Sequence, residues 1–300
     1  MRHEAAVLIQ RVPLIPSLGA LGSVQSRPLT FPATYVFVHY KNRFIRFAAV
    51  FLLLIPRSTS AQTFAPGSDP QAVALASSAV AALTGGAVLR DVTLTGTVTR
   101  NVTGPDSGTA LLKALGTGES RVDLALSGGT RTEIRDGSTG ISLGKWINPD
   151  GGTGTYSFHN TLTDPVWFFP ALGSLAASPN IVLSYIDQET RNGVAVEHLR
   201  SYLLQNGQSP DPLMQRLSTM DFYLNASTLL PMSVIFTTHP DNNAIVSLPV
   251  EVDFSGYQTL EGVAVPMHIQ RYLQGHLEDD IVVSTAAFNT GLSVSSFSVN

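Results

Sequence analysis

The sequence predicts a mainly β (α+β) domain, a curved antiparallel sheet or half-barrel that wraps over helices. The first observation is alternation. In DVTLTGTVTR, residues 91–100, apolar side chains alternate with threonines, which is the period of a half-buried strand. The second observation is that many such segments follow one another, separated by short turns. The third is that strands and helices do not alternate along the chain, which disfavours a parallel sheet.

Two segments are predicted to be helical. DPQAVALASSAVAALTGG, residues 69–86, begins with a capping aspartate before a proline, is rich in alanine and ends at two glycines. Its apolar residues recur three or four positions apart, which gives the helix one buried stripe. SPDPLMQRLS, residues 209–218, predicts a brief helical turn. These are the helices over which the sheet is expected to curl.

Turn residues mark the ends of the predicted strands. Asn192-Gly193 suits the positive φ angles of a tight hairpin, and Pro149-Asp150-Gly151-Gly152 predicts another. A further turn is expected at Glu278-Asp279-Asp280, near the end of the chain. The spacing of these turns indicates a meander of antiparallel strands.

Prolines at strand starts predict that the sheet bends sharply. LNASTLLPMSVIF and YQTLEGVAVPMHI each place a turn, then Pro231 or Pro266, then an apolar strand. Proline cannot donate a ladder hydrogen bond, so it belongs at a strand's first residues, at an edge or at a bulge. A curved sheet needs such bends, and an open sheet that curls over a helix has a concave apolar face.

The composition excludes several classes of protein. The 300 residues carry a formal net charge of −4 and only 13% charged residues, so there is no basic surface for nucleic acid. There are no cysteines, which excludes disulfides, thiolate metal sites and a cysteine nucleophile. No sequence feature predicts a cofactor.

The first part of the chain predicts export. KNRFIRFAAVFLLLIPRSTSAQ has a basic start, a short apolar run and small residues, so residues 41–61 are expected to be a signal peptide with cleavage near Ala61. The apolar run is shorter than a membrane span, and no transmembrane anchor is predicted in the mature chain. Residues 1–40 form an extension that a start codon assigned too far upstream would explain. Residues 62–300 are expected to form one domain, periplasmic or secreted.

The search for catalytic and metal-binding patterns favours a protein without catalysis. Ser142-Leu143-Gly144-Lys145 matches the Ser-x-x-Lys pattern of acyl-enzymes, but that chemistry needs a helix and the context here predicts a strand. The histidines are scattered without zinc-ligand spacing. His276 with residues 278–280 could suggest a metal site, although a solvated hairpin tip is the simpler interpretation. No catalytic residue and no metal ligand is therefore predicted.

Several hairpin segments resemble one known family. These segments are DFYLNASTLLPMSVIF, VDFSGYQTLEGVAVPMHI, KWINPDGG and a closing strand in AAFNTGLSVSSFSV. In this order they resemble the LolA/LppX-like group of periplasmic lipid and lipoprotein carriers, over residues 71–299. The resemblance implies a half-barrel of antiparallel strands with a helical lid, enclosing a cavity for acyl chains. It transfers no functional residue to this sequence.

Aromatic residues are the candidate ligand contacts. DPVWFFP places Trp167, Phe168 and Phe169 together in a short helix or irregular lid, where three adjacent aromatics cannot all face inward. Ordinary packing of the lid would explain them, as would closure of a cavity or docking of a partner. On the predicted strands, Phe222, Phe236 and Phe254 are expected to line the concave face.

These observations lead to one leading hypothesis and two alternatives. The leading hypothesis is an exported, non-enzymatic protein that binds an apolar ligand, either a lipid or a lipidated protein, in the half-barrel. The first alternative is a sensor of envelope stress that uses the same fold to bind a protein segment. The second is a secreted hydrolase whose Ser-His-carboxylate triad is dispersed along the sequence.

Overall fold

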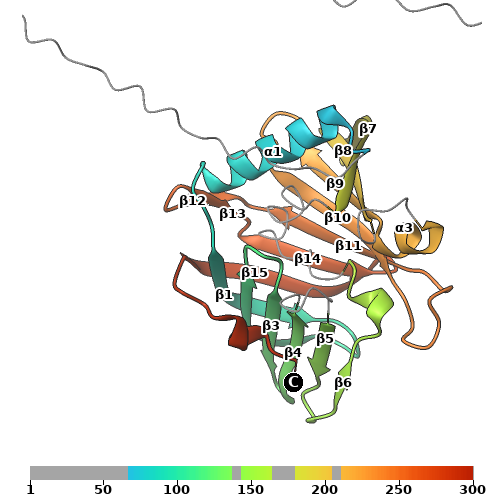
Figure 1. The fold of residues 1–300 in the computed structure, drawn as a ribbon. Helices are drawn as coiled ribbons and strands as arrows, with labels where there is room; N and C mark the ends of the chain where they lie inside the picture. Colours follow the sequence, from blue (N-terminus) through green and yellow to red (C-terminus); the bar gives the residue numbers. More distant parts are fainter. Residues whose placement is uncertain (1–66, 137–142, 164–179, 205–210, 300) are drawn as a thin grey trace, which may run out of the picture. The chain divides into compact units, whose positions relative to one another are not determined.

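The computed structural model describes residues 67–136, 143–163, 180–204 and 211–299. The chain divides into two units, Met1–Ser58 and Thr59–Asn300, and all of the described residues belong to the second. The predicted fold class is confirmed, because these residues form one large antiparallel sheet that is strongly curved and not closed (Figure 1).

Thirteen strands make up the large sheet, in the order β6-β5-β4-β3-β2-β1-β15-β14-β11-β10-β9-β8-β7. Two short strands pair separately as β12–β13. The bounds are β1 (Asp91–Arg100), β2 (Asp106–Leu115), β3 (Ser120–Leu126), β4 (Gly129–Asp136), β5 (Leu143–Ile147), β6 (Thr153–Thr155), β7 (Ile181–Arg191), β8 (Val194–Leu203), β9 (Met220–Asn225), β10 (Pro231–Thr238), β11 (Leu248–Ser255), β12 (Gln258–Leu260), β13 (Val263–Val265), β14 (His268–Leu273) and β15 (His276–Phe288).

The predicted N-terminal helix is α1 (Pro70–Thr84), which packs against β7 and β13. Asp69 caps it by accepting a hydrogen bond from the amide of Gln71 at 2.8 Å, and Gly85 ends it with φ near 60°. Its buried side chains are mostly alanines, which let the helix lie close to the strands (Figure 1). The second predicted helix is α3 (Pro212–Ser218), capped by Asp211. None of the helices in the described ranges is long and apolar enough to cross a membrane.

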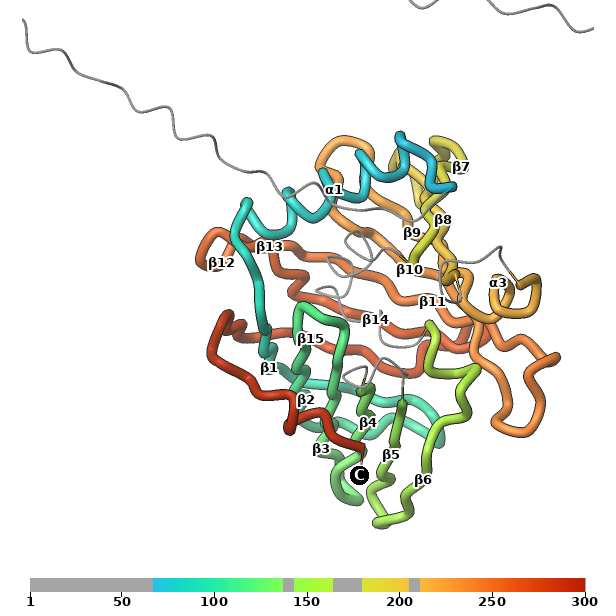
Figure 2. The backbone as a smooth tube through the Cα atoms, in the orientation of Figure 1, coloured from blue at the N-terminus to red at the C-terminus, as the bar shows by residue number. Residues whose placement is uncertain are grey.

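Bulges curve the sheet. The pairing register shifts between Thr95 and Gly96 where β1 meets β15, and between Arg271 and Tyr272 where β14 meets β15. An unpaired extra residue at a bulge bends the strand and increases its twist. Gly96 is required at its bulge, because a Cβ atom there would lie 2.1 Å from the carbonyl oxygen of Val282. Figure 2 shows the resulting curl in the backbone trace.

The two prolines mark bends, as predicted. Pro231 is the first residue of β10, at a register shift between Pro231 and Ser233. Pro266 lies between β13 and β14, so the apolar segment that contains it is two strands rather than one. After the bend, β14 joins the large sheet, whereas β12 and β13 form a small hairpin against α1. Proline at these positions removes no hydrogen bond from a continuous ladder.

The turns follow the prediction in most places and depart from it at the last hairpin. Asn192 and Gly193 have φ near 50° and 79° and connect β7 to β8. The last hairpin instead turns at Gln274-Gly275, where φ is 52° and 79°. The predicted turn at residues 278–280 is therefore wrong, because these carboxylates lie inside β15 and two of them pair with arginines described below.

The C-terminal segment leaves the sheet after Phe288 and folds over the convex face of β3 and β4. It ends in a 3₁₀ turn, η3 (Val294–Phe297), whose Phe297 is fully buried beside Leu115 and Ile134. The closing strand seen in the sequence therefore ends earlier than expected. The segment is held at its start by Asp91, whose carboxylate accepts hydrogen bonds from the backbone amides of residues 290–292 and from the hydroxyl of Thr290.

The first prediction concerns this carboxylate. Asp91→Ala should lower the free energy of unfolding by about 1–3 kcal/mol, because the backbone amides at the start of the C-terminal segment lose a buried, charged acceptor. Burial raises the pKa of Asp91, but the hydrogen bonds from Thr290, Gly291 and Leu292 outweigh burial and lower it. The stabilisation is therefore present at neutral pH and is lost as the pH falls through the lowered pKa.

Urea unfolding of wild type and variant at two pH values checks this prediction. Asp187→Ala is the control, because the Asp187 side chain is 60% exposed and the substitution should change stability by less than about 0.5 kcal/mol. Equal unfolding midpoints for wild type and Asp91→Ala at neutral pH would contradict the role given to Asp91.

Candidate functional site

The candidate functional site is the concave face of the large sheet, where inward side chains of both halves form one apolar surface. Residues that face each other across neighbouring strands share this face, as Phe222, Val234 and Val252 do. The inward residues also pack against the buried side chains of α1. Its members on the strands include Val92, Leu94, Val98, Leu112, Val122, Leu124, Leu199, Phe222, Val234, Phe236, Val250, Val252, Phe254, Ile269, Ile281 and Val283.

The structure places three of the predicted ligand contacts on this face. Phe222, Phe236 and Phe254 lie on β9, β10 and β11, and each is 4% exposed or less. They pack into the same cluster as the rest of the concave face, and contact with a ligand stays a prediction. Residues 167–169, the predicted aromatic lid, lie outside the described residues, so the structure does not test them.

A group of ion pairs occupies the end of the concave face where β1 finishes. The guanidinium of Arg100 donates to Glu278 at 2.8 Å and to Asp279 at 2.6 Å. Arg271, from β14, pairs with the other oxygen of Glu278. These side chains are only 5–14% exposed, so they are removed from bulk water. Burial raises the pKa of Asp279, and the neighbouring arginines reduce this effect without cancelling it.

Strand β4 adds charges to the same face. Arg131 donates to Glu133 and to the side-chain oxygen of Asn148, both at 2.7 Å. Arg135 places its guanidinium 3.7 Å from the centre of the Tyr156 ring, a cation–π contact. Register puts these β4 charges on the inward side, because Arg131 lies opposite the buried Leu124 of β3.

The charges of β4 and β14 face each other across the trough. Burial raises the pKa of Glu133, but the surrounding guanidinium groups, first that of Arg131 and then that of Arg271, outweigh burial and lower it to about 2. An effect of Arg271 on Glu133 requires the two walls to approach, because β4 and β14 are separated by four strands in the sheet. We call the set Arg100, Arg131, Glu133, Arg135, Arg271, Glu278 and Asp279 the charged cluster.

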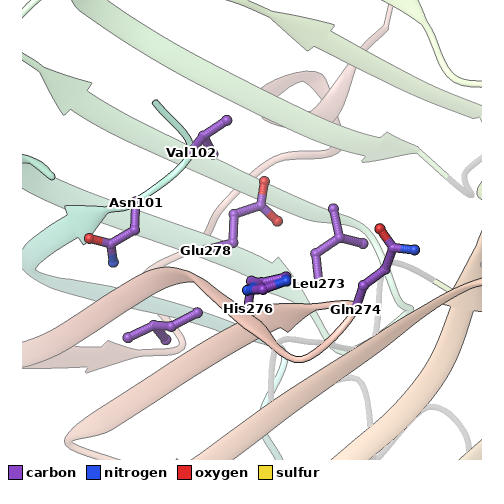
Figure 3. A pocket seen from close by; sticks show the side chains of 7 residues that line it. Asn101, Val102, Leu273, Gln274, His276 and Glu278 are labelled. Carbon is purple, nitrogen blue, oxygen red and sulfur yellow. The ribbon is translucent and has the colours of Figure 1, made fainter. Parts of the chain in front are cut away.

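A pocket opens beside the charged cluster. It has a volume of about 400 Å³ and lies between the β1–β2 connection and the β14–β15 hairpin. Figure 3 shows Glu278 between Asn101 and Val102 on one side and Leu273 on the other. Because Glu278 holds Arg100 and Arg271, the pocket leads from solvent to the charged cluster.

A second pocket of about 470 Å³ lies beside α3. Arg200, Arg216 and Asp221 line it together with the predicted ligand contact Phe236. Arg200 pairs with Asp221 at 2.8 Å, and Arg216 donates to the carbonyl of Ala244 at 2.7 Å. Most of the residues that line this pocket are polar and none belongs to the charged cluster, so we do not place the functional site there.

A short segment after β6 binds the connection between β10 and β11, and we call this segment the clasp. It contains the 3₁₀ turn η1 (Phe158–Asn160). The amide group of the buried Asn160 donates to the carbonyl of His239 at 2.7 Å and accepts from the backbone amide of His239 at 2.8 Å. Ser157 bonds to Asp241 in the same β10–β11 connection. The clasp therefore joins the β6 edge to β10 and β11, which lie many strands away in the sheet.

His239 lies at the centre of the clasp. Its Nδ1 is 2.7 Å from the carbonyl oxygen of Val246, and its ring meets that of His159 edge to face at 5.7 Å. Burial lowers the pKa of His239 below the ordinary 6.5, and the positive charge of Arg216 and the ring of His159 lower it further, against the hydrogen bond to Val246. The neutral ring is thus the form that the clasp favours.

One Ser-His-Asp set lies within hydrogen-bond reach, on the convex face. Ser255 Oγ is 3.5 Å from Nδ1 of His268, whose Nε2 is 2.6 Å from Asp280. Ser255 is exposed, and neither pocket is lined by any of the three residues. A triad on an open face has no site that excludes water or holds an oxyanion. Among the described residues, no group of three His, Asp or Glu side chains could hold a metal ion.

Sequence reasoning missed the charged cluster, although one signal for it is present. TRTEIRD in β4 alternates arginine and glutamate with Thr132 and Ile134, which puts Arg131, Glu133 and Arg135 on one face. Alternation alone does not decide which face is concave. Here the convex face of β4 is covered by the C-terminal segment, so the charges lie inside the trough.

The comparisons with known proteins concern the fold. No protein-family model matches the chain, and no curated protein matches its sequence. One similar solved structure is described as an outer membrane lipoprotein-sorting protein domain from Vibrio parahaemolyticus (14% identity, TM-score 0.49, 76% of this chain and 96% of that one). Another is a DUF1329 family protein from Desulfovibrio piger (12% identity, TM-score 0.49, 76% and 97%).

A LolA superfamily protein from Nitrosomonas europaea is similar at the same level, with 11% identity and a TM-score of 0.47 over 76% of this chain and 97% of that one. The resemblance to the LolA/LppX-like group, expected from the hairpin segments, is thus present as a remote likeness in structure. The likeness is one of fold alone, and we take no function from it.

The second prediction concerns the clasp. The unfolded chain takes up a proton on His239 more readily than the folded chain does, so the stability of the fold should decrease as the pH falls from about 7 to about 5. His239→Gln removes this titration and should make the decrease smaller. Chemical unfolding at a series of pH values measures both slopes.

His276→Gln is the matched control, because His276 is exposed in the last hairpin and makes no contact with the clasp. It should retain the pH dependence of the wild type. If His239→Gln and wild type lose stability in parallel, the clasp does not depend on a neutral His239.

Proposed function

We propose that the chain is an exported, non-enzymatic binding protein that holds an apolar ligand, a lipid or a lipidated protein, against the concave face of its sheet. The observation that carries this proposal is the apolar inward surface, which runs across both halves of one curved sheet. A single sheet has no second sheet to cover its concave side, and the inward side chains are already buried, in part against α1, so an acyl chain bound there would take the place of packing that these side chains now have.

The leader supports the exported location in this proposal. Residues 41–61 have the basic, apolar and small-residue order of a secretory signal peptide. An exported protein that binds acyl chains meets lipids and lipidated proteins in its own compartment. A curved sheet with an apolar concave face shields an acyl chain from water, and burying each methylene contributes about 0.8 kcal/mol.

A protein-binding role is the second candidate, and one observation favours it. β7 is the last strand of the sheet order, and its residues 186–188 are exposed. Among the residues that the structure describes, the α1 region covers the first part of β7, where Leu183 bonds to Asp69 and Ser68. An exposed strand edge can accept an extended segment of another protein by adding a strand.

The third prediction tests the leading proposal. The protein purified from its native host should carry bound lipid or acylated peptide, seen as added mass in native mass spectrometry and identified after organic extraction. Extraction should lower the unfolding temperature, because a ligand that binds only the folded state stabilises it. Protein that carries no lipid and that shows no shift with added lipids would favour the protein-binding candidate.

The fourth prediction tests the absence of catalysis. A fluorophosphonate probe should not label Ser255, because no described group around Ser255 forms a cleft that would activate its hydroxyl. Wild type and Ser255→Ala should give the same background signal. Labelling that disappears in Ser255→Ala and in His268→Gln would support the hydrolase alternative instead.

A further inference from the structure

One polar side chain lies within an apolar row on the concave face. Ser201 of β8 pairs with Leu183 of β7 on one side and with Met220 of β9 on the other. Both partners belong to the apolar cluster of the concave face, so the register puts Ser201 on that face as well. The row runs from β7 to β14, and its other members are Leu183, Met220, Phe236, Val250 and Leu273.

The hydroxyl of Ser201 is buried and unpaired. Ser201 is 0% exposed, and within the described ranges its Oγ has no hydrogen-bond partner. Ser218, equally buried nearby, shows the usual arrangement: its Oγ donates to the carbonyl of Met214 at 2.6 Å and accepts from the amide of Leu203 at 2.9 Å. A buried hydroxyl without a partner destabilises a fold, so few are retained. Packing alone therefore does not account for a serine at position 201.

The surroundings of Ser201 define the group that would satisfy it. A serine hydroxyl can donate to an ester carbonyl, and it can donate to or accept from another hydroxyl. The rest of the row is apolar, so a carboxylate placed there would lose its water without gaining a counter-charge. An uncharged oxygen attached to a hydrocarbon chain fits both the hydroxyl and the apolar row. Ligand sites of this kind are mostly apolar, with a few polar groups that fix the orientation of the ligand.

A ligand that reaches Ser201 must take the place of side chains that now cover the concave face. Helix α1 packs on β7, and the residues just before it bond to the backbone of Leu183, which lies opposite Ser201. The buried side chains of α1 are alanines apart from Leu83. Stabilisation by burial grows with apolar area, so α1 contributes less than a leucine-rich helix would. A shift of α1 away from β7 is the movement that we expect to admit a ligand.

We propose that Ser201 is the polar anchor of the concave face, where its hydroxyl hydrogen-bonds to an uncharged oxygen of the ligand, either an ester carbonyl or a hydroxyl. This inference rests on the proposed function and specifies its ligand as an ester or an alcohol of a long hydrocarbon chain. If Ser201 only filled space, replacing it with alanine would affect all apolar ligands alike.

Three uncharged ligands with the same number of non-hydrogen atoms test the proposal: methyl dodecanoate, tetradecan-1-ol and pentadecane. Displacement of a fluorescent hydrocarbon, diphenylhexatriene, from the full-length protein as purified and delipidated measures each affinity. Ser201→Ala should weaken the binding of the ester, the alcohol or both about tenfold, a difference of about 1.4 kcal/mol. Binding of pentadecane should not change. The ligand that loses more affinity identifies the oxygen as a carbonyl or a hydroxyl.

Two controls separate a lost anchor from a damaged fold. Ser201→Ala removes an unpaired buried hydroxyl, so its urea unfolding midpoint without ligand should equal or exceed that of the wild type. A lower midpoint would show that the hydroxyl already has a structural role, and would overturn the assignment. Ser233→Ala is the matched substitution, because Ser233 is buried on β10 but faces Tyr223 and Asp253 on the convex side. It should retain the wild-type affinity for all three ligands.

The outcomes also separate this inference from the proposed function. An equal loss for all three ligands in Ser201→Ala, or no loss for any, would overturn the polar anchor while leaving an apolar ligand in place. Failure of the wild type to bind any of the three would contradict the proposed function as well. A loss confined to the oxygen-containing ligands, with an unfolding midpoint that does not fall, would establish Ser201 as the anchor.

Discussion

A single sheet must bury its inward side chains without a second sheet to cover them, and this constraint shapes the whole domain. The strands meet it by curling, so that the two halves of the sheet face each other and α1 fills part of the space between them (Figure 1). Bulges at Gly96 and at Arg271–Tyr272 provide the curvature, and both lie at pairs formed by β15, the strand between the two halves. The apolar concave face is a consequence of this geometry.

The same curl brings the charges of β4 opposite those of β14. Arginines and carboxylates on separate walls lose water as the walls approach, and they compensate for this by pairing with one another. Buried ion pairs contribute little net stability.

The open ends of the sheet are secured by segments that have no regular structure of their own. The clasp at Asn160 joins the β6 edge to the β10–β11 connection, and the C-terminal segment closes the convex face of β3 and β4 through Asp91 and Phe297. Both rely on side chains that satisfy backbone groups, which is how buried irregular segments avoid the cost of unpaired polar groups. The curved sheet can thus keep its shape without closing into a barrel.

The sequence by itself determined the class of fold, because that information is local. Alternation marked the strands, Asp69 and Gly85 marked the ends of α1, and Asn192-Gly193 marked a hairpin. Pro231 and Pro266 indicated the bends, since proline restricts its own position in a ladder. It also placed Phe222, Phe236 and Phe254 on strands whose inward face is apolar.

Only the tertiary structure decided where the charges lie. The carboxylates of residues 278–280 looked like a solvated turn, because a sequence does not show that arginines from β1 and β14 come within 3 Å of two of them. Likewise, the alternation of Arg131, Glu133 and Arg135 puts them on one face of β4, but the sequence does not show that this face is the concave one. In the structure Phe297 covers the opposite face, so the three charged side chains lie on the concave side. Contacts between residues more than a hundred positions apart depend on curvature, and curvature is a property of the whole sheet.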